Sequence, residues 1–225
     1  MGAFYFRMQN DTTTRIVLIR HGETAWNAER RLQGHLDIDL NATGLRQARA
    51  LAAALANERF DVLVSSDLSR AAQTAKAVAE VQDLPLYIDG RLRERCYGGF
   101  EGLLYAEIAD RFPQEFAAWQ ARDVDAPLPP GENCAETFRQ FYDRVVPAIL
   151  GWAEDNPGKS LALVAHGGVL ECAYRAALDL PLDTPRDFKV HNASINRFTV
   201  QDGRLQLESW GEVAHLQAAV LDDVG

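Results

Sequence analysis

The sequence predicts an α/β fold in which helices cover both faces of a mostly parallel central sheet. Short aliphatic runs alternate with longer segments whose apolar residues recur at helical spacing, and this alternation is typical of such folds. Two of the runs, Ile16–Ile19 and Leu161–Val164, contain no polar residue. Uninterrupted aliphatic strands of this kind are buried on both faces of a parallel sheet. We therefore expect a three-layer αβα architecture.

The remaining elements follow from the same periodicities. Further strands are expected at 61–64 and 86–88, with a C-terminal pair at 195–200 and 205–210. The segment Gln201–Arg204 joins that pair, and its Asp-Gly step is typical of a β-hairpin turn. Helices are expected at 45–55, 68–79, 105–111, 115–122 and 135–155, with another after Gly167-Gly168. Pro147 lies inside the 135–155 helix, which we expect it to kink or interrupt.

The chain is expected to form one domain. Its 225 residues, 47% of them hydrophobic, are enough to bury a core. Residues 1–14 are interpreted as a flexible N-terminal tail, because they run from a short apolar patch into a polar stretch, and residues 15–225 as the domain. Residues 103–134 contain the proline-rich run Ala126–Gly131. Prolines forbid regular structure there, so we expect a lid insertion in this region.

Charge and cysteine content exclude several classes of partner. The formal net charge is −9, so long-range electrostatics repel nucleic acid and anionic membranes, and an anionic ligand must be held by local positive charge. The three cysteines form no C-x-x-C pair and suggest neither a disulfide framework nor a thiolate zinc knuckle. No apolar stretch reaches the ~20 residues of a membrane span. We expect a cytoplasmic protein that is monomeric or homodimeric.

Residues that suit phosphate chemistry follow two of the strands. Arg20 and His21 come directly after the first aliphatic run, and His166 comes after the later one. Because ligands collect at the carboxyl ends of parallel strands, both histidines are expected to face one crevice. A neutral imidazole is a nucleophile at neutral pH, and an arginine fork can hold two phosphate oxygens. Gly22 allows a backbone carbonyl of the turn to hold the other ring nitrogen of His21.

Four ordered motifs resemble those of the histidine phosphatase superfamily, which includes the cofactor-dependent phosphoglycerate mutases. The first is Arg20-His21-Gly22-Glu23, followed by Asn27 and Gln33-Gly34. The others are the segment 65–75 around Arg70, the segment 92–102 around Glu94, and Val164–Gly168 with His166. A lone Arg-His-Gly-Glu is weak evidence, whereas four ordered motifs in matching contexts are strong. The resemblance runs from Arg15 to about Leu216.

The resemblance implies phosphate transfer through a covalent intermediate. His21 would carry the phosphoryl group, and Glu94 would protonate the leaving alcohol and then activate water. Arg20, Arg70 and His166 would complete the catalytic set by binding phosphate. Further phosphate- or substrate-binding positions are expected at Asn27, Gln33, Gly34, Arg95, Tyr97 and Gly167. The amides of Gly167 and Gly168, at a helix N-terminus, would add partial positive charge. The expected ligand is a small phosphorylated metabolite, and neither a metal nor a cofactor is expected.

Hydrolysis by a phosphomonoesterase is preferred over a bisphosphoglycerate-dependent phosphoglycerate mutase, for which 2,3-bisphosphoglycerate would be the cofactor. Mutase-like members of the family carry an adjacent arginine pair in the lid, whereas this chain has Arg122 between Ala121 and Asp123. Gly168 stands where those members tend to carry asparagine, and Cys96 where they usually carry histidine. These departures favour release of the phosphate to water.

Two further alternatives remain. A regulatory protein that binds a phosphorylated ligand without turnover would not need the nucleophile, the acid and both arginines, all of which are retained here. A zinc ion on His21 and His166 would lack a third ligand at metal spacing, and the neighbouring arginine would repel it.

Overall fold

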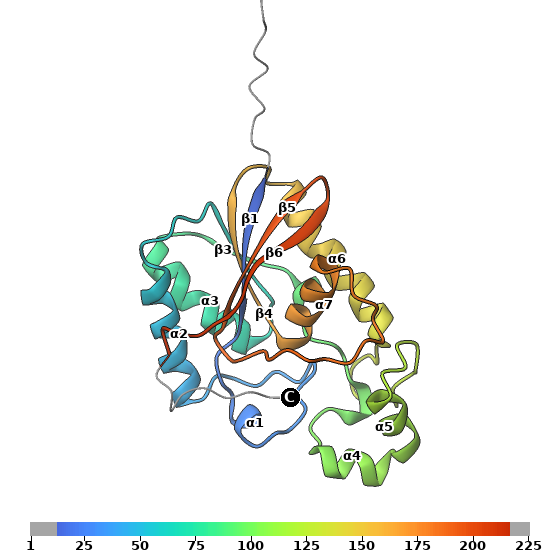
Figure 1. Cartoon of the computed structure of the whole chain (residues 1–225). Helices are drawn as coiled ribbons and strands as arrows, with labels where there is room; N and C mark the ends of the chain where they lie inside the picture. Colours follow the sequence, from blue (N-terminus) through green and yellow to red (C-terminus); the bar gives the residue numbers. More distant parts are fainter. Residues whose placement is uncertain (1–12, 217–225) are drawn as a thin grey trace, which may run out of the picture.

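The computed structural model describes residues 13–216, within which a six-stranded sheet forms the centre of the molecule (Figure 1). The strand order is β3-β2-β4-β1-β5-β6. The strands are β1 (Thr14–Arg20), β2 (Val62–Ser65), β3 (Leu86–Ile88), β4 (Ser160–Ala165), β5 (Ile195–Gln201) and β6 (Arg204–Glu212). The first four are parallel to one another, whereas β5 runs antiparallel to β1 and β6 antiparallel to β5. The mostly parallel sheet is therefore confirmed.

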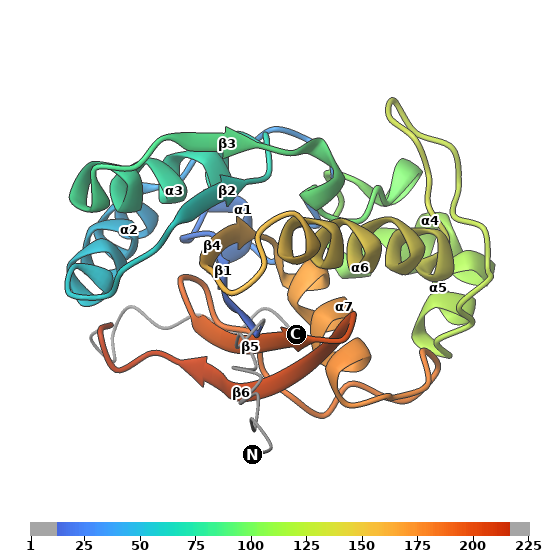
Figure 2. The same ribbon diagram turned by 90° about the horizontal axis from the view of Figure 1, so that it is seen from above.

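Helices cover both faces of the sheet, which confirms the three-layer αβα architecture (Figure 2). The helices α2 (Ala42–Leu55) and α3 (Ser69–Gln82) lie on one face, and α6 (Phe138–Glu154) and α7 (Gly167–Ala177) on the other. Alternate residues of β1 point to opposite faces: Val17 and Ile19 pack with α2 and α3, whereas Ile16 and Leu18 pack with α6 and α7. Each such buried side chain stabilises the fold by about 1.5–3 kcal/mol, which explains why residues 16–19 of this strand are all aliphatic.

A separate group of short helices lies beyond one end of the sheet (Figure 1). The helices α4 (Tyr105–Arg111) and α5 (Pro113–Gln120) pack around a third apolar cluster, built on Phe100, Ile108 and Leu128. We call residues 103–134, where the sequence predicts a lid insertion, the helical cap. Outside it, α1 (Ala25–Ala28) and the 3₁₀ turns η1 (Gly90–Leu92) and η2 (Gly98–Phe100) occur in connecting segments.

Pro147 does not interrupt α6, contrary to one of the two outcomes expected from the sequence. The helix is continuous from Phe138 to Glu154 with the proline inside it. Pro147 is exposed, whereas Phe141, Val145 and Ile149 are buried against the sheet. Most helical stability in proteins comes from such packing of an apolar face, so the loss of one N–H on the exposed side is tolerated.

The ends of the described chain refine the predicted boundaries. Thr14, which the sequence places in the flexible tail, is the first residue of β1 and is opposite Val200 of β5. Residues 1–12 and 217–225 lie outside the described residues. At the other end, Asp202 and Gly203 have positive φ angles of 52° and 71°, as a type I′ hairpin turn requires. Within 13–216, no helix has the length and apolar character needed to span a bilayer. The cytoplasmic location and the monomeric or homodimeric state stay predictions.

Candidate active site

The register of the sheet places the two strand-end histidines side by side. β1 and β4 are parallel neighbours with Arg20 opposite Ala165, and the His21 amide donates to the Ala165 carbonyl at 3.0 Å. His21 and His166 therefore leave adjacent strands at the same edge, with ring centroids 5.2 Å apart. Both side chains are buried.

His21 has the ring orientation and charge state of a nucleophile. Its Nδ1 donates to the Gly22 carbonyl at 2.7 Å, so Nε2 carries the lone pair. This is the carbonyl-held ring that the sequence predicted. Burial, and then the positive charges of Arg70 and Arg20, lower the pKa of His21 well below its usual value. The imidazole is therefore neutral at neutral pH.

The turn that carries His21 is packed directly against the first turn of α2. A Cβ atom at Gly22 would lie 2.6 Å from the Gly44 carbonyl oxygen, and one at Gly44 would lie 2.0 Å from the Glu23 carbonyl oxygen. Only glycine at both positions permits this approach. The Gly22 amide also donates to the Thr74 hydroxyl at 3.0 Å, which ties the turn to α3.

His166, the N-cap residue of α7, lies beside the nucleophile. Its Nε2 is 2.9 Å from the Ser66 hydroxyl oxygen, and its Nδ1 is buried without a hydrogen-bond partner among the described residues. Burial, and then the charges of Arg70 and His21, lower the pKa of His166 well below its usual value. The site thus holds two neutral imidazoles, one of which has an unused buried nitrogen.

Two buried arginines bring positive charge to the same edge. Arg20 is 5% exposed and donates to the Val190 carbonyl. Arg70, in the first turn of α3, donates from Nη1 to the Leu36 carbonyl at 3.0 Å and from Nη2 to the Gly34 carbonyl at 2.7 Å. Its Nε is buried without a partner among residues 13–216. Burial lowers the pKa of Arg70 to about 10, so it remains charged at neutral pH. A fixed guanidinium with an unused N–H is suited to binding an anion.

The side-chain amide oxygens of Asn27 and Gln33 accept hydrogen bonds from other residues of the chain. Oδ1 of Asn27 accepts from the Thr24 amide at 3.0 Å and from Nδ2 of Asn192 at 3.3 Å. Oε1 of Gln33 accepts from the Thr24 hydroxyl at 3.0 Å. Both residues line the cavity described below. Because their oxygens are engaged, their NH₂ groups remain to donate to a ligand.

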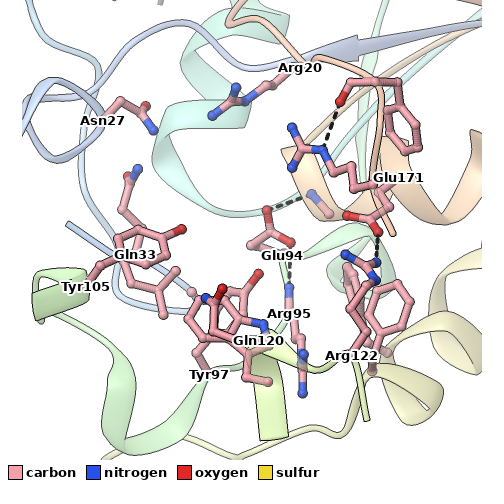
Figure 3. A pocket seen from close by; sticks show the side chains of 18 of the residues that line it. Arg20, Asn27, Gln33, Glu94, Arg95, Tyr97, Tyr105, Gln120, Arg122 and Glu171 are labelled. Atoms are coloured by element: carbon pink, nitrogen blue, oxygen red, sulfur yellow. Dashed lines mark hydrogen bonds and ion pairs between the residues drawn. The ribbon is translucent and has the colours of Figure 1, made fainter. Parts of the chain in front are cut away.

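Glu94 is held by both its main chain and its carboxylate, and Figure 3 shows the contacts of the carboxylate. Its carbonyl accepts from Nε2 of His35 at 2.8 Å and from Nη2 of Arg144 at 3.1 Å. Its Oε1 accepts from the Arg95 amide at 2.8 Å and its Oε2 from the Gly168 amide at 3.0 Å. The carboxylate is therefore fixed between its own segment and the start of α7.

The two glycines at the start of α7 define the space around this carboxylate. A Cβ atom at Gly168 would lie 2.2 Å from Oε1 of Glu94 and 2.9 Å from the Phe141 ring. One at Gly167 would lie 3.5 Å from Nε of Arg20 and 3.9 Å from Oε2 of Glu94, so the guanidinium and the carboxylate face the same small space. The Gly168 amide, which the sequence suggested as a source of partial positive charge for the phosphate, donates its N–H to the carboxylate of Glu94.

Most of the groups described above line one cavity of about 820 Å³ (Figure 3). The predicted residues that line it are Arg20, His21, Asn27, Gln33, Gly34, Arg70, Glu94, Arg95 and Tyr97. His166 and Gly167 are not part of the lining. Among the described residues, seven cationic and four acidic side chains line the cavity, although the chain as a whole carries −9. The local positive charge required for an anionic ligand is present.

The chain is similar to known proteins over nearly its whole length. A family model described as the histidine phosphatase superfamily (branch 1) matches residues 16–213. The chain belongs to this superfamily. It is 38% identical over 207 residues to a metal-independent phosphoserine phosphatase of Arabidopsis thaliana, spanning 91% of this chain and 84% of that one. It is 37% identical over 205 residues to phosphoglycerate mutase-like protein 4 of the same plant, spanning 90% and 86%. A solved mycobacterial glucosyl-3-phosphoglycerate phosphatase matches with a TM-score of 0.78 at 31% identity, over 89% of this chain and all of that one.

In this histidine phosphatase, sequence reasoning missed much of the cavity wall away from His21. Glu171 of α7 lines it and accepts hydrogen bonds from Arg122 of the helical cap and from Arg175. In the sequence, only the spacing of three residues between Gly168 and Glu171 indicates that Glu171 lies on the same face of the helix as Gly168. Other missed lining residues are Tyr105, Trp119, Phe138 and the segment 185–189. The family motifs do not include these positions.

Proposed function

We propose that this chain is a phosphomonoesterase that hydrolyses a small phosphorylated metabolite through a phosphohistidine intermediate on His21. The observation that carries the proposal is a neutral, carbonyl-held imidazole beside two buried arginines and a fixed carboxylate in one cavity. A metal-independent phosphatase among the relatives supports it. His21 supplies the nucleophile and Arg20 and Arg70 supply the positive charge, so we assign no metal to the reaction.

In the first step, Nε2 of His21 attacks the phosphorus atom. A P–N bond forms while the bond to the alcohol oxygen breaks, and Glu94 gives that oxygen a proton, a contribution of about 10²–10⁴ in rate. Arg20 and Arg70 stabilise the charge that develops on the equatorial oxygens. The Gly22 carbonyl accepts a hydrogen bond from Nδ1–H and so stabilises the positive charge that the ring acquires.

In the second step, water takes the phosphoryl group from His21. Glu94, now deprotonated, accepts a proton from the water as it attacks phosphorus, and inorganic phosphate leaves. His166 assists from the neighbouring position: with the Ser66 hydroxyl donating to Nε2, its Nδ1 carries a proton that can be donated toward the phosphoryl group. This role gives a function to an otherwise unused buried nitrogen.

The rest of the cavity binds the organic part of the substrate. Tyr97, Tyr105 and Trp119 present aromatic surface, and Arg95 and Arg186 add positive charge. A substrate with a second anionic group, such as a carboxylate, suits this wall better than a neutral alcohol. Arg122 is paired with Glu171, which largely neutralises its charge, so Arg122 binds a bisphosphate weakly. This pairing favours hydrolysis over a mutase reaction, which must retain its bisphosphate intermediate.

Labelling of the enzyme tests the covalent step. Incubation with a ³²P-labelled phosphomonoester, followed by quenching without acid, is expected to leave acid-labile label on the wild-type chain and none on His21→Ala. Glu94→Gln is expected to slow both formation and loss of the label. Absence of label on the wild type, or its persistence in His21→Ala, would exclude a phosphohistidine at this position. A chain that binds phosphate but neither gains label nor releases phosphate would be a regulatory protein.

A substrate panel tests the preference for hydrolysis. We expect phosphate release from phosphoserine and 3-phosphoglycerate to exceed release from glycerol phosphate, because of the cationic wall. With 3-phosphoglycerate, addition of 2,3-bisphosphoglycerate is expected to leave phosphate release dominant. Isomerisation to 2-phosphoglycerate that depends on bisphosphate and outpaces phosphate release would identify a mutase.

A further inference from the structure

A group of soft ligand atoms lies next to the active site but takes no part in the proposed reaction. The side chains of His35, Cys96 and Cys134 place Nδ1 or Nε2 and two Sγ atoms within 4.8 Å of one another. They come from the loop between α1 and α2, from the segment that carries Glu94, and from the end of the helical cap. None of the three lines the catalytic cavity.

The imidazole of this group is already oriented as a metal ligand. Nε2 of His35 donates to the Glu94 carbonyl at 2.8 Å, so the lone pair is on Nδ1. That Nδ1 lies 3.8 Å from Sγ of Cys134. In proteins, a ligating histidine usually donates its other ring N–H to a carbonyl or carboxylate in this way.

The distances are close to those of a tetrahedral thiolate and imidazole site. Zinc–sulfur bonds of about 2.3 Å and zinc–nitrogen bonds of about 2.0–2.1 Å place neighbouring ligand atoms roughly 3.5–3.8 Å apart. The three atoms reach that spacing from within 4.8 Å by small side-chain shifts. Cys134 is exposed, which provides an entry path for the ion, whereas Cys96 is fully buried.

The surroundings favour a cation. The His35 amide donates to Oε1 of Glu101 at 2.9 Å, and the Cys96 amide donates to Oε2 of Glu136 at 2.9 Å. The guanidinium of Arg144 is paired with Glu136 at 2.7 Å. A second nearby arginine, Arg93, forms an ion pair with Asp67. These two guanidinium groups are therefore neutralised, and Glu101 leaves an excess of negative charge beside the ligand atoms.

We propose that His35, Cys96 and Cys134 bind one soft divalent cation of the zinc class, outside the catalytic centre. Two S–H bonds are replaced by two S–metal bonds, both protons go to water, and a water molecule completes the coordination. Two sulfur atoms and one imidazole nitrogen are soft ligands, so Zn²⁺ and Cd²⁺ fit this site, whereas Mg²⁺ prefers oxygen ligands and does not.

The bound ion would join three segments that flank the catalytic cavity. His35 follows Gly34, whose carbonyl holds Arg70, and Cys96 lies two residues after Glu94. Cys134 is the last residue of the helical cap. The site therefore pins the cap to the segments that position the arginine and the acid, without touching the phosphoryl group. It is independent of the phosphatase proposal, because it requires neither His21 nor turnover.

Titration of metal-free protein with Cd²⁺ tests the proposal. The wild type is expected to bind one equivalent with a thiolate-to-cadmium charge-transfer band in the ultraviolet, which Zn²⁺ removes by competition and Mg²⁺ does not. In Cys134→Ser the affinity is expected to fall at least about tenfold and the band to weaken. His35→Gln is expected to lower the affinity by a similar factor. Because Cys134 is exposed, its serine variant is expected to fold, which circular dichroism checks.

Two control variants separate this site from other sites. Cys172→Ala removes the one cysteine outside the group and should leave the band and the stoichiometry unchanged. His21→Ala should also leave them unchanged, which excludes binding by the catalytic histidines. A wild type without a thiolate band at millimolar Cd²⁺, or wild-type affinity in both Cys134→Ser and His35→Gln, would overturn the proposal. Loss of the band in Cys172→Ala or His21→Ala would also overturn it.

Discussion

Replacement of Gly168 by alanine is expected to displace the carboxylate of Glu94 and to slow the cleavage of substrates with poor leaving groups. The added Cβ would lie 2.2 Å from Oε1 of Glu94, whereas ordinary contacts begin at 3.4 Å. The carboxylate must therefore retreat by about 1 Å, because the Phe141 ring on the other side is packed in the core. A misplacement of this size costs about 10²-fold in rate. We expect kcat/KM for an alkyl phosphate to fall by about that factor.

The assay compares two substrates that differ in their need for an acid. Phosphoserine releases an alcohol that must be protonated, whereas p-nitrophenyl phosphate releases an anion that leaves without a proton. Because kcat/KM reports steps only up to release of the alcohol, it excludes the later hydrolysis of the phosphoenzyme. The variant is expected to lose activity on phosphoserine and to change by less than about threefold on the aryl ester.

Gly167→Ala is the matched control. Its added Cβ would meet Arg20 and Glu94 at 3.5 and 3.9 Å, which are ordinary contacts, so both activities should remain near the wild-type level. Circular dichroism melting would show that both variants are folded. An equal loss on the two substrates in Gly168→Ala, or full activity on phosphoserine, would refute the assignment of Glu94 as the acid and of Gly168 as the residue that makes room for it.

Three further predictions concern charge. The pKa values of His21 and His166 are lowered in the folded chain, so below about pH 6.5 the unfolded chain binds more protons than the folded chain. The free energy of unfolding should therefore decrease as the pH is lowered below that value, by up to about 1.4 kcal/mol per pH unit for each group. Equal urea midpoints at pH 7.5 and pH 5.5 would contradict this. Arg70→Lys should lower kcat/KM by about 10²–10³, since a compact ammonium lacks the planar fork that spans the Gly34 and Leu36 carbonyls and still directs an N–H at the phosphate. Near-normal kinetics would exclude that role. Arg122→Met should remove one of the two arginines that neutralise Glu171, so that this carboxylate repels a second anionic group in the cavity. KM for carboxylated substrates should rise about five- to tenfold while KM for p-nitrophenyl phosphate stays unchanged, and an equal rise for both substrates would contradict this reason.

The sheet and the central part of the site follow from local patterns in the sequence. Ile16–Ile19 and Leu161–Val164 could be predicted as buried strands because all their residues are aliphatic. Ligands bind at the carboxyl ends of parallel strands, so His21 and His166 could be predicted to lie close together, as they do. The Gly22 carbonyl could be predicted as the partner of Nδ1 because it is the next residue. Family motifs supplied Arg70 and Glu94, whose roles stay proposals.

The rest of the cavity wall and the group around His35 depend on contacts between residues far apart in the sequence, which no sequence pattern indicates. Glu171 meets Arg122 across 49 positions of sequence, and His35 meets Cys134 across 99. No spacing rule relates such residues, because loops and the helical cap set their approach. Pro147 is the opposite case, in which a sequence pattern predicts a disruption that the structure does not have. A proline inside a helix usually kinks or interrupts it, yet the packing of the buried side of α6 against the sheet keeps this helix continuous.

The helical cap packs around an apolar cluster that it shares with Phe100, Tyr97 and Leu32, and this cluster is distinct from the two clusters on the faces of the sheet. Residues such as Trp119 and Tyr105 line the cavity from this cap, away from the two clusters that hold the sheet together. Substitutions there can reshape the wall that meets the organic group while the turn around His21 stays fixed by glycine backbones against α2. Evolution and protein engineering can therefore vary which phosphorylated compound is accepted without rebuilding the machinery that handles the phosphoryl group.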